Sequence, residues 1–212
     1  MGNPFFSVIV PAHNSEKYIS KCLDSIKIQT FTDYELIVVC DACTDNTFRE
    51  AREYDLYVPE ITVIETYYGM DGLARNKGID LSRGKWLLFL DDDDWWIHEY
   101  VLEDIHRVVT MEYGAMLDMV CFDFIWKGKG YAKVEPHRMN IAVWSKAFRR
   151  EFIGETRFPA IPFTSDQPFM DEICAKKPCA IAMHELMYYY NYLRKGSQSE
   201  VHARPDGTAP EA

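Results

Sequence analysis

Four consecutive aspartates, Asp91 to Asp94, follow an apolar run in the stretch LFLDDDDWW. Adjacent carboxylates repel one another, so a cluster of four at the end of a buried strand favours a bound cation. Mg²⁺ and Mn²⁺ prefer oxygen ligands and commonly share their coordination shell with substrate phosphates. In an extended stretch alternate side chains point the same way, which groups Asp91 with Asp93 and Asp92 with Asp94. The cluster predicts a divalent-metal site, with a solvated acidic turn as the alternative.

Short apolar runs alternate with helical patterns around this cluster. The predicted strands are 5–10, 34–39, 61–65 and 85–90, and the predicted helices are 15–30, 46–55, 72–84 and 98–114. Gly84 is interpreted as a left-handed stop for the third helix. The alternation predicts a mostly parallel α/β sheet covered on both faces. Ligands in such sheets bind beyond the carboxyl ends of the strands, and the polar stretches HN, CDACTDN, YYGMDG and DDDD all follow predicted strands.

The second half of the chain is less regular. It contains a predicted strand at 118–126, a segment at 141–153 that begins extended and becomes a short helix, a proline-broken loop at 158–163, and a helix at 165–177. Residues 179–193 suggest two short strands, and the tail at 204–212 is expected to be disordered. No internal repeat or linker is visible, so we expect a single domain over residues 1–203.

Composition narrows the class of protein. The 212 residues carry a net charge of −10, which argues against a nucleic-acid partner, and 48% hydrophobic residues provide for a full core. No stretch reaches the roughly 18 to 20 apolar residues of a membrane span, and the N-terminus does not read as a signal peptide. A cytoplasmic protein with reduced cysteines is therefore expected. Cys40 and Cys43 form a C-x-x-C, but Cys174 and Cys179 are loosely spaced, so structural zinc is disfavoured.

Five segments together resemble the family 2 glycosyltransferases of the GT-A fold: SVIVPAHN, ELIVVCDACTDNT, GLARNKGIDLSRGKWLLFLDDDDWW, SDQPF and YYYNYLRKGSQS. They run from residue 7 to about residue 199 in the family's order. The resemblance implies an inverting enzyme that moves a sugar from a nucleotide-diphosphate sugar, with a UDP-linked donor expected, to a hydroxyl of a saccharide or lipid-linked acceptor. It also implies Mn²⁺ or Mg²⁺ as cofactor, a nucleotide-sugar-binding half at 1–114, an acceptor-binding half at 115–203, and a role in polysaccharide or glycoconjugate synthesis.

The resemblance also implies roles for individual residues on the donor side. Asp91 and Asp93 are the expected metal ligands, with Asp93 the best single one. Cys40 and Cys43 stand where the family usually has an acid and a serine, which leaves the nucleotide open. The expected nucleotide-sugar contacts are Pro11, Ala12 and Asn14 in the first loop, Asp41 at the base, Arg75 near the donor, Asp92 near the ribose or sugar, and Arg194 in a loop over the diphosphate.

The same resemblance places the catalytic base at the start of the helix at 165–177. Inversion requires a carboxylate that takes the acceptor proton. Ser165 stands for the first acid of the family's pair and Asp166 for the second, the expected base. A helix cap is the alternative for Asp166, and Asp171 and Glu172 are weaker alternatives for the base.

Two further residues, Trp144 and Lys146, resemble a candidate acceptor wall. A buried tryptophan in the core is the alternative for Trp144. Peripheral association of the protein with a membrane is left open.

Three other functions are alternatives to an inverting glycosyltransferase. A sugar-phosphate nucleotidyltransferase would carry a glycine-rich loop after the first strand, and PAHNSEKY contains no glycine. A glycoside hydrolase uses paired carboxylates but needs no metal motif. A catalytically degenerate nucleotide-sugar binder gains weight from the substitutions at Cys40 and Ser165.

Overall fold

The computed structural model describes residues 2–58, 60–136 and 142–192. Within them, nine strands form one sheet in the order β3-β2-β1-β4-β8-β6-β9-β5, with β7 paired to β6. The strands are β1 Phe6–Ala12, β2 Tyr34–Asp41, β3 Ile61–Thr66, β4 Trp86–Phe89, β5 Trp95–Trp96, β6 Met119–Trp126, β7 Gly130–Ala132, β8 Lys146–Arg149 and β9 Ala180–Tyr190. The helices are α1 Ile19–Lys27, α2 Thr47–Arg52, α3 Asp71–Leu81, α4 Val101–Thr110, α5 Arg150–Ile153 and α6 Asp166–Ala175, with 3₁₀ turns at Glu53–Leu56, Gly114–Met116 and Val143–Ser145.

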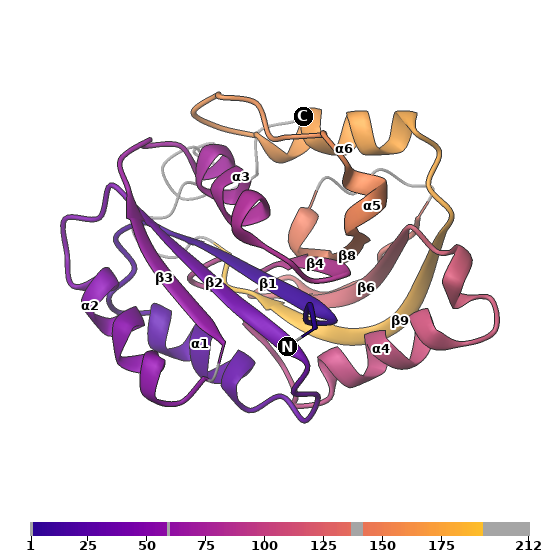
Figure 1. Ribbon diagram of the computed structural model, residues 1–212, viewed down its shortest axis with the longest axis horizontal. Helices are drawn as coiled ribbons and strands as arrows, with labels where there is room; N and C mark the ends of the chain where they lie inside the picture. Colours follow the sequence, from indigo (N-terminus) through magenta and orange to yellow (C-terminus); the bar gives the residue numbers. More distant parts are fainter. Residues whose placement is uncertain (1, 59, 137–141, 193–212) are drawn as a thin grey trace.

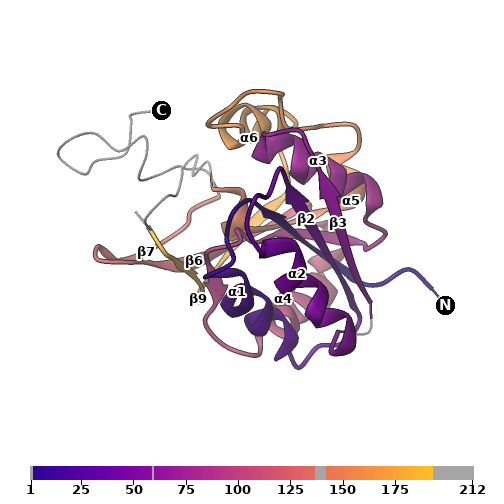
Figure 2. The same cartoon turned by 90° about the vertical axis from the view of Figure 1, so that its left-hand side faces the viewer.

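The sheet is mixed. β3, β2, β1 and β4 run parallel, as the alternating pattern predicts, whereas β8 is antiparallel to both β4 and β6. Figures 1 and 2 show α1, α2 and α4 on one face and α3, α5 and α6 on the other. Because both faces are covered, the central strands are continuous apolar runs that are buried along their whole length. No helix of the described residues is long and apolar enough to cross a membrane.

Aromatic packing fixes the start of α6 above the end of β4. Phe169 of α6 stacks on Phe158 with ring centroids 4.0 Å apart, and both rings pack edge-on against Phe89 at the end of β4. Three buried aromatic side chains of this size anchor the helix firmly. The first residue of α6, Asp166, is thereby held near the carboxyl edge of the parallel strands.

Two predicted elements in the second part of the chain differ from the structure. The helix predicted over 98–114 ends at Thr110, and Gly114 opens a separate 3₁₀ turn. Up to residue 192, the segment predicted as two short strands contains one strand, β9. The strand is locally irregular: His184 has φ of 50°, and the β6–β9 register shifts beside it.

The interpretation of Gly84 is also corrected. Its backbone is not left-handed, and α3 already ends at Leu81, before an extended Ser82. A Cβ at position 84 would lie 2.5 Å from the backbone nitrogen of Ser7 and 2.6 Å from the carbonyl carbon of Phe6. Glycine is required at this position because β1 passes too close for any side chain.

Replacing Gly84 with alanine is therefore expected to destabilise the protein by about 1–3 kcal/mol, because backbone atoms would have to move. Urea unfolding at constant m-value measures the change. Gly2→Ala is the matched control, since nothing lies within 4 Å of its Cβ position. Equal unfolding midpoints for the two variants would contradict the close-approach explanation.

Candidate active site

The loops that follow the parallel strands meet at one edge of the sheet. The backbone N–H of His13 donates to Asp92 Oδ2 at 2.8 Å, and the His13 ring nitrogen Nδ1 lies 2.7 Å from the Asp41 carbonyl oxygen. The Ala42 N–H donates to the Thr66 carbonyl at 2.8 Å. The polar stretches after β1, β2, β3 and β4 thus come together, as the sequence predicts.

The four aspartates form a tight turn rather than an extended stretch. The Asp94 N–H donates to the Asp91 carbonyl at 3.1 Å, which closes a four-residue turn. Because side chains in a turn do not alternate between two opposite directions as they do in a strand, the grouping of alternate aspartates, which assumed an extended stretch, is wrong. Asp91 Oδ1 accepts from Arg75 Nη2 at 2.8 Å, and Asp92 faces the β1 loop. The carboxylates of Asp91 and Asp92 point toward different partners, which reduces the repulsion between them.

Asp94 turns into the core and anchors the turn to β9. Its carboxylate is fully buried and accepts hydrogen bonds from the Tyr188 hydroxyl at 2.6 Å and the Asn191 N–H at 2.7 Å. Burial, together with the charges of Asp93 and Asp91, raises the pKa of Asp94 well above its usual range. This residue therefore shapes the acidic turn and does not face a ligand.

Asp41 lies at the end of β2 and is only 3% exposed. Its Oδ1 accepts from the Thr66 hydroxyl at 2.9 Å and the Tyr68 N–H at 2.7 Å, and its Oδ2 accepts from the Met70 N–H at 3.0 Å. A carboxylate has about four acceptor positions, so one remains for a ligand. Through these three hydrogen bonds, Asp41 chiefly holds the loop between β3 and α3 in place.

Arg75 on α3 joins three carboxylates from different elements. Its Nη1 donates to Asp71 Oδ2 at 2.5 Å and lies 3.4 Å from Asp166 Oδ1, while its Nη2 contacts Asp91. The guanidinium is 5% exposed. Burial lowers the pKa of Arg75, but the carboxylates of Asp166, Asp91 and Asp71 outweigh burial and raise it overall. The predicted donor-side arginine thus links the acidic turn to the start of α6.

Asp166 is the first residue of α6, preceded by Ser165 at the cap position. Its Oδ2 accepts from the Val143 N–H at 3.4 Å and its Oδ1 faces Arg75, so both of these contacts are with residues outside its own helix. Burial raises the pKa of Asp166 to about 6, against the opposing effect of Arg75. A carboxylate of this basicity is suited to accept a proton near neutral pH.

The two other acids of α6, Asp171 and Glu172, contact different partners from Asp166. Asp171 is exposed and accepts from the Gln167 side chain at 2.8 Å. Glu172 accepts from the Thr156 hydroxyl at 2.5 Å. Of the three, Asp166 is the one that contacts Arg75, so the geometry of the described residues favours Asp166 as the base.

The candidate acceptor residues are buried. Trp144 is 7% exposed and stacks on Tyr188, with ring centroids 4.4 Å apart. Lys146 is 3% exposed, its Nζ donates to the Ala142 carbonyl at 2.6 Å, and burial lowers its pKa to about 8. An acceptor wall needs exposed surface, so the structure favours the alternative that Trp144 belongs to the core.

The remaining predicted donor contacts lie on the β1 loop. Pro11 and Ala12 are buried at the end of β1. Pro11 lies beyond the last β1 residue that pairs with β4, so its missing N–H removes no hydrogen bond between these two strands. Asn14 is exposed, has φ of 48°, and accepts from the Thr44 N–H at 2.8 Å. Arg194 lies outside the described residues, as does the predicted tail.

The carboxylates of the acidic turn fit a divalent cation only in part. Their hard oxygen atoms are the ligand type that Mg²⁺ and Mn²⁺ prefer. Among the described residues, however, no three His, Cys, Asp or Glu side chains converge on one point. Asp91 Oδ1 is occupied by Arg75. The protein thus offers a partial shell that phosphate oxygens of a ligand would have to complete.

Sequence reasoning missed two residues of the site, Asp71 and Tyr188. The predicted helix began at Gly72, one residue late, so the i,i+4 spacing from Asp71 to Arg75 went unused although it indicates an ion pair. Tyr188, whose hydroxyl joins Asp94 and the Asp91 N–H, is the first residue of the segment YYYNYLRKGSQS, but nothing in that segment indicates a contact with the acidic turn. Its position depends on the pairing of β9 with β6.

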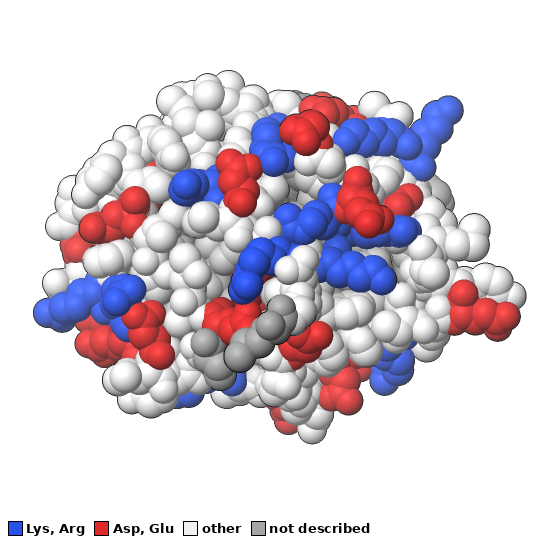
Figure 3. Space-filling model, viewed as in Figure 1, with Lys and Arg blue, Asp and Glu red and all other residues white. Residues whose placement is uncertain are grey.

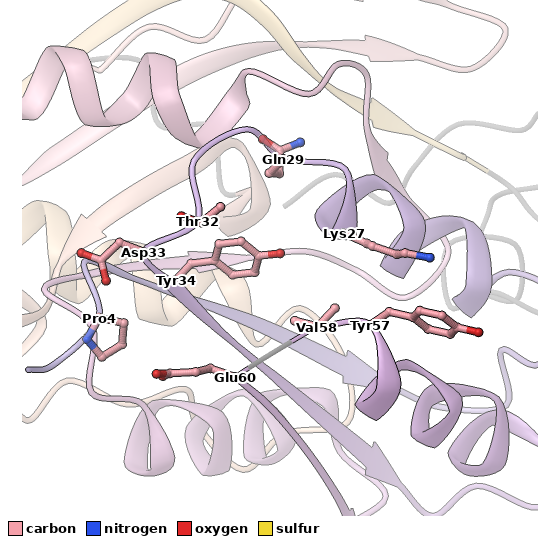
Figure 4. A pocket seen from close by; sticks show the side chains of 9 residues that line it. All are labelled: Pro4, Lys27, Gln29, Thr32, Asp33, Tyr34, Tyr57, Val58 and Glu60. Atoms are coloured by element: carbon pink, nitrogen blue, oxygen red, sulfur yellow. The ribbon is translucent and has the colours of Figure 1, made fainter. Parts of the chain in front are cut away.

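Two hollows lie at the other edge of the sheet. The first, of about 320 Å³, is lined by Lys27 at the end of α1, Asp33 and Tyr34 at the start of β2, and residues that precede β1 and β3 (Figure 4). The second, of about 330 Å³, is lined partly by Arg83, Lys85 and Arg150, and Figure 3 shows Lys and Arg side chains gathered over β4, β8 and α5. Neither contains a predicted site residue, so the chemistry rather than cavity volume identifies the candidate site.

The mixed sheet, with an acidic turn and a carboxylate–guanidinium cluster at the carboxyl edge of its parallel strands, has the GT-A fold, as the solved structures show. Staphylococcus aureus TarS in complex with UDP-GlcNAc superimposes with a TM-score of 0.80 at 25% identity, over 93% of this chain and 60% of that one. A Pyrobaculum calidifontis mannosyltransferase, PcManGT, in complex with GDP-Man and Mn²⁺, superimposes with a TM-score of 0.74 at 19% identity, over 95% of this chain and 60% of that one.

A family model described as glycosyl transferase family 2 matches residues 7–169, and the chain belongs to that family. A Mycobacterium tuberculosis relative, the PGL/p-HBAD biosynthesis glycosyltransferase, is 41% identical over 162 residues, which cover 73% of this chain and 62% of the relative. Streptococcus pneumoniae glycosyltransferase GlyA is 28% identical over 221 residues, which cover 92% of this chain and 31% of GlyA. The sequence matches span less than a third of GlyA and about a fifth of full-length TarS, of which the structure compared above contains residues 1–349.

Proposed function

We propose that the protein transfers a sugar, with inversion, from a UDP-linked donor to an acceptor hydroxyl. The observation that carries the proposal is Asp166, a carboxylate with a side chain 17% exposed and a pKa raised to about 6, held beside Arg75 and the acidic turn. A proton acceptor next to a cluster suited to a charged donor is the arrangement that such a transfer needs. The TarS complexes with UDP-GlcNAc and with UDP support a UDP-linked donor.

In the proposed reaction, Asp166 takes the proton of the acceptor hydroxyl as its oxygen attacks the anomeric carbon. The bond from that carbon to the diphosphate oxygen breaks, and the nucleoside diphosphate leaves with the electron pair. The developing positive charge on the sugar and the negative charge on the leaving group are stabilised by fixed charges. Arg75 holds Asp91 and faces Asp166, so the donor side and the base are positioned by one guanidinium.

We assign Asp93 as the protein ligand of a divalent cation, Mn²⁺ or Mg²⁺. Asp91, predicted as a second ligand, is assigned to the ion pair with Arg75 instead, because that pair occupies its Oδ1. When bound, such a cation neutralises diphosphate charge and helps the nucleotide to leave. PcManGT and a mycobacterial glucosyl-3-phosphoglycerate synthase, both solved with Mn²⁺, support a cation in this fold.

The β1 loop, with Pro11, Ala12 and Asn14, and the residues Asp41 and Asp92 are proposed to border the nucleotide sugar. Residues 1–114 then form the donor half and residues 115–203 the acceptor half of one domain. The names of relatives that act on poly(ribitol-phosphate) or in glycolipid biosynthesis favour a saccharide or lipid-linked acceptor in polysaccharide or glycoconjugate synthesis. A cytoplasmic location and peripheral membrane association stay predictions.

A thermal-shift screen of nucleotide sugars with and without Mn²⁺ tests the proposed donor. A bound donor raises the melting temperature in proportion to the logarithm of its concentration over its dissociation constant. We expect a UDP-sugar with Mn²⁺ to give the largest rise, and the purified protein to release UDP from it slowly, with water as acceptor. Donor binding without release or transfer to any acceptor would favour a degenerate nucleotide-sugar binder. Absence of binding by every donor would refute both.

A further inference from the structure

We propose that Asp71 is a positioning residue for the transfer reaction: its carboxylate holds the Arg75 guanidinium on the α3 side and keeps it from forming a close ion pair with Asp166. This inference rests on the proposed role of Asp166 as the base. Asp71 lies in the polar stretch YYGMDG, but the sequence assigns it no role, and its place in the site is seen only in the contacts of the folded chain.

One nitrogen atom of Arg75 is shared by two carboxylates. Nη1 donates to Asp71 Oδ2 at 2.5 Å, a short charge-assisted hydrogen bond, but lies 3.4 Å from Asp166 Oδ1, which is long for such a bond. Nη2 is meanwhile held by Asp91 at 2.8 Å. Asp71 and Asp166 therefore compete for the same donor, and Asp71 has the shorter bond.

Local packing keeps Asp71 in this position. Asp71 opens α3, and the i,i+4 spacing places its carboxylate directly over Arg75. The Ser165 hydroxyl donates to Asp71 Oδ2 at 3.2 Å, which ties the start of α3 to the residue before Asp166. A Cβ at Gly72 would lie 2.9 Å from the Ser165 Cβ, so the two helix starts are already in the closest contact that they tolerate.

The charges that face Asp166 come from each element packed around it. Arg75 and Asp71 lie on α3, Asp91 follows β4, and Lys146 lies on β8. Burial raises the pKa of Asp166; Arg75 opposes that effect, while Asp91 and Asp71 add to it. Without Asp71, Nη1 is free to move onto Asp166, where a close guanidinium would stabilise the charged carboxylate and make it a weaker base.

Asp71→Asn tests the proposal, with Asp171→Asn on the exposed side of α6 as the matched charge control. We expect Asp71→Asn to lower the turnover of UDP-GlcNAc hydrolysis about three- to tenfold on the pH plateau, because a weaker base is slower. The acid limb of the pH–rate profile should move to lower pH by about one unit or more, the effect of a cation brought close to a carboxylate. Asp171→Asn should show neither change.

A double variant separates this role from a merely structural one. Asp71→Ser combined with Ser165→Asp exchanges carboxylate and hydroxyl across their contact, and aspartate is as good a helix cap as serine. The acid limb should return toward that of the wild type. Titration of the Asp166 carboxyl by ¹³C NMR reports the same shift without turnover, so it stays decisive even if the proposed activity is absent. An unchanged Asp166 titration in folded Asp71→Asn would overturn the proposal.

Discussion

Asp166→Asn is expected to lower glycosyl transfer by about 10²- to 10⁴-fold, the usual contribution of a positioned general base. Asparagine keeps the shape of the side chain and can still meet the Val143 N–H, but it cannot accept a proton. Donor binding should change little, because Asp166 faces Arg75 rather than the β1 loop. Initial rates and donor calorimetry on the same preparation measure the two effects separately.

The pH dependence of the wild-type enzyme follows from the raised pKa of Asp166. The base works only when deprotonated, so the rate should fall as the pH drops through about 6 and should be level above it. The ordinary aspartate value is about 3.9, so the folded protein disfavours the charged form. The free energy of unfolding depends on pH in the opposite direction. The folded protein tolerates the protonated form of Asp166 better than the charged form, so its stability falls as the pH rises from about 4 through about 6.

Asp166→Asn should consequently melt at a higher temperature than the wild type at pH 7, where the wild type carries the buried charge. A variant that is less active but more stable is typical of a functional residue and excludes loss of activity through unfolding. Glu172→Gln, on the same helix and bonded to Thr156, is the control and should retain activity. Transfer by purified Asp166→Asn at the wild-type rate would move the base to another residue.

The fold was predictable to the extent that it depends on local patterns. Continuous apolar runs indicate β1, β2, β3 and β4, because strands covered on both faces need no polar alternation. The antiparallel insertion of β8 between β4 and β6 could not be predicted, since a four-residue strand has little pattern of its own. Gly84 shows the same limit. Its position in the sequence fits a helix stop, but glycine is required there because Ser7 of β1, 77 positions away, leaves no room for a side chain.

The site was predictable in its location but not in its internal contacts. Parallel strands bring their carboxyl ends to one edge, so the convergence of His13, Asp41 and Asp92 follows from topology. The direction in which each aspartate side chain points does not follow from topology. It depends on whether residues 91–94 continue the strand or form a turn. The pairing of Asp91 with Arg75 and of Asp94 with Tyr188 depends on helices and strands that are distant in sequence.

Asp93→Ala is expected to reduce metal-stimulated transfer by about 10²- to 10³-fold. Lewis-acid stabilisation supplies several kcal/mol, and each 1.4 kcal/mol corresponds to a factor of ten. The carboxylates of Asp91, Asp92 and Asp94 contact Arg75, His13 and Tyr188, so a substitution at any of these three would also disturb the turn.

The measurement is a Mn²⁺ titration of the rate after removal of metal with a chelator. The wild type should lose activity with the chelator and regain it with Mn²⁺ or Mg²⁺, whereas Asp93→Ala should need far more metal or fail to respond. Asp80→Ala, an exposed aspartate of α3 paired only with Arg157 among the described residues, controls for the loss of one negative charge. If Asp93→Ala responds to Mn²⁺ as the wild type does while Asp91→Ala does not, Asp91 would be the ligand. Its ion pair with Arg75 would then have to open when the donor binds.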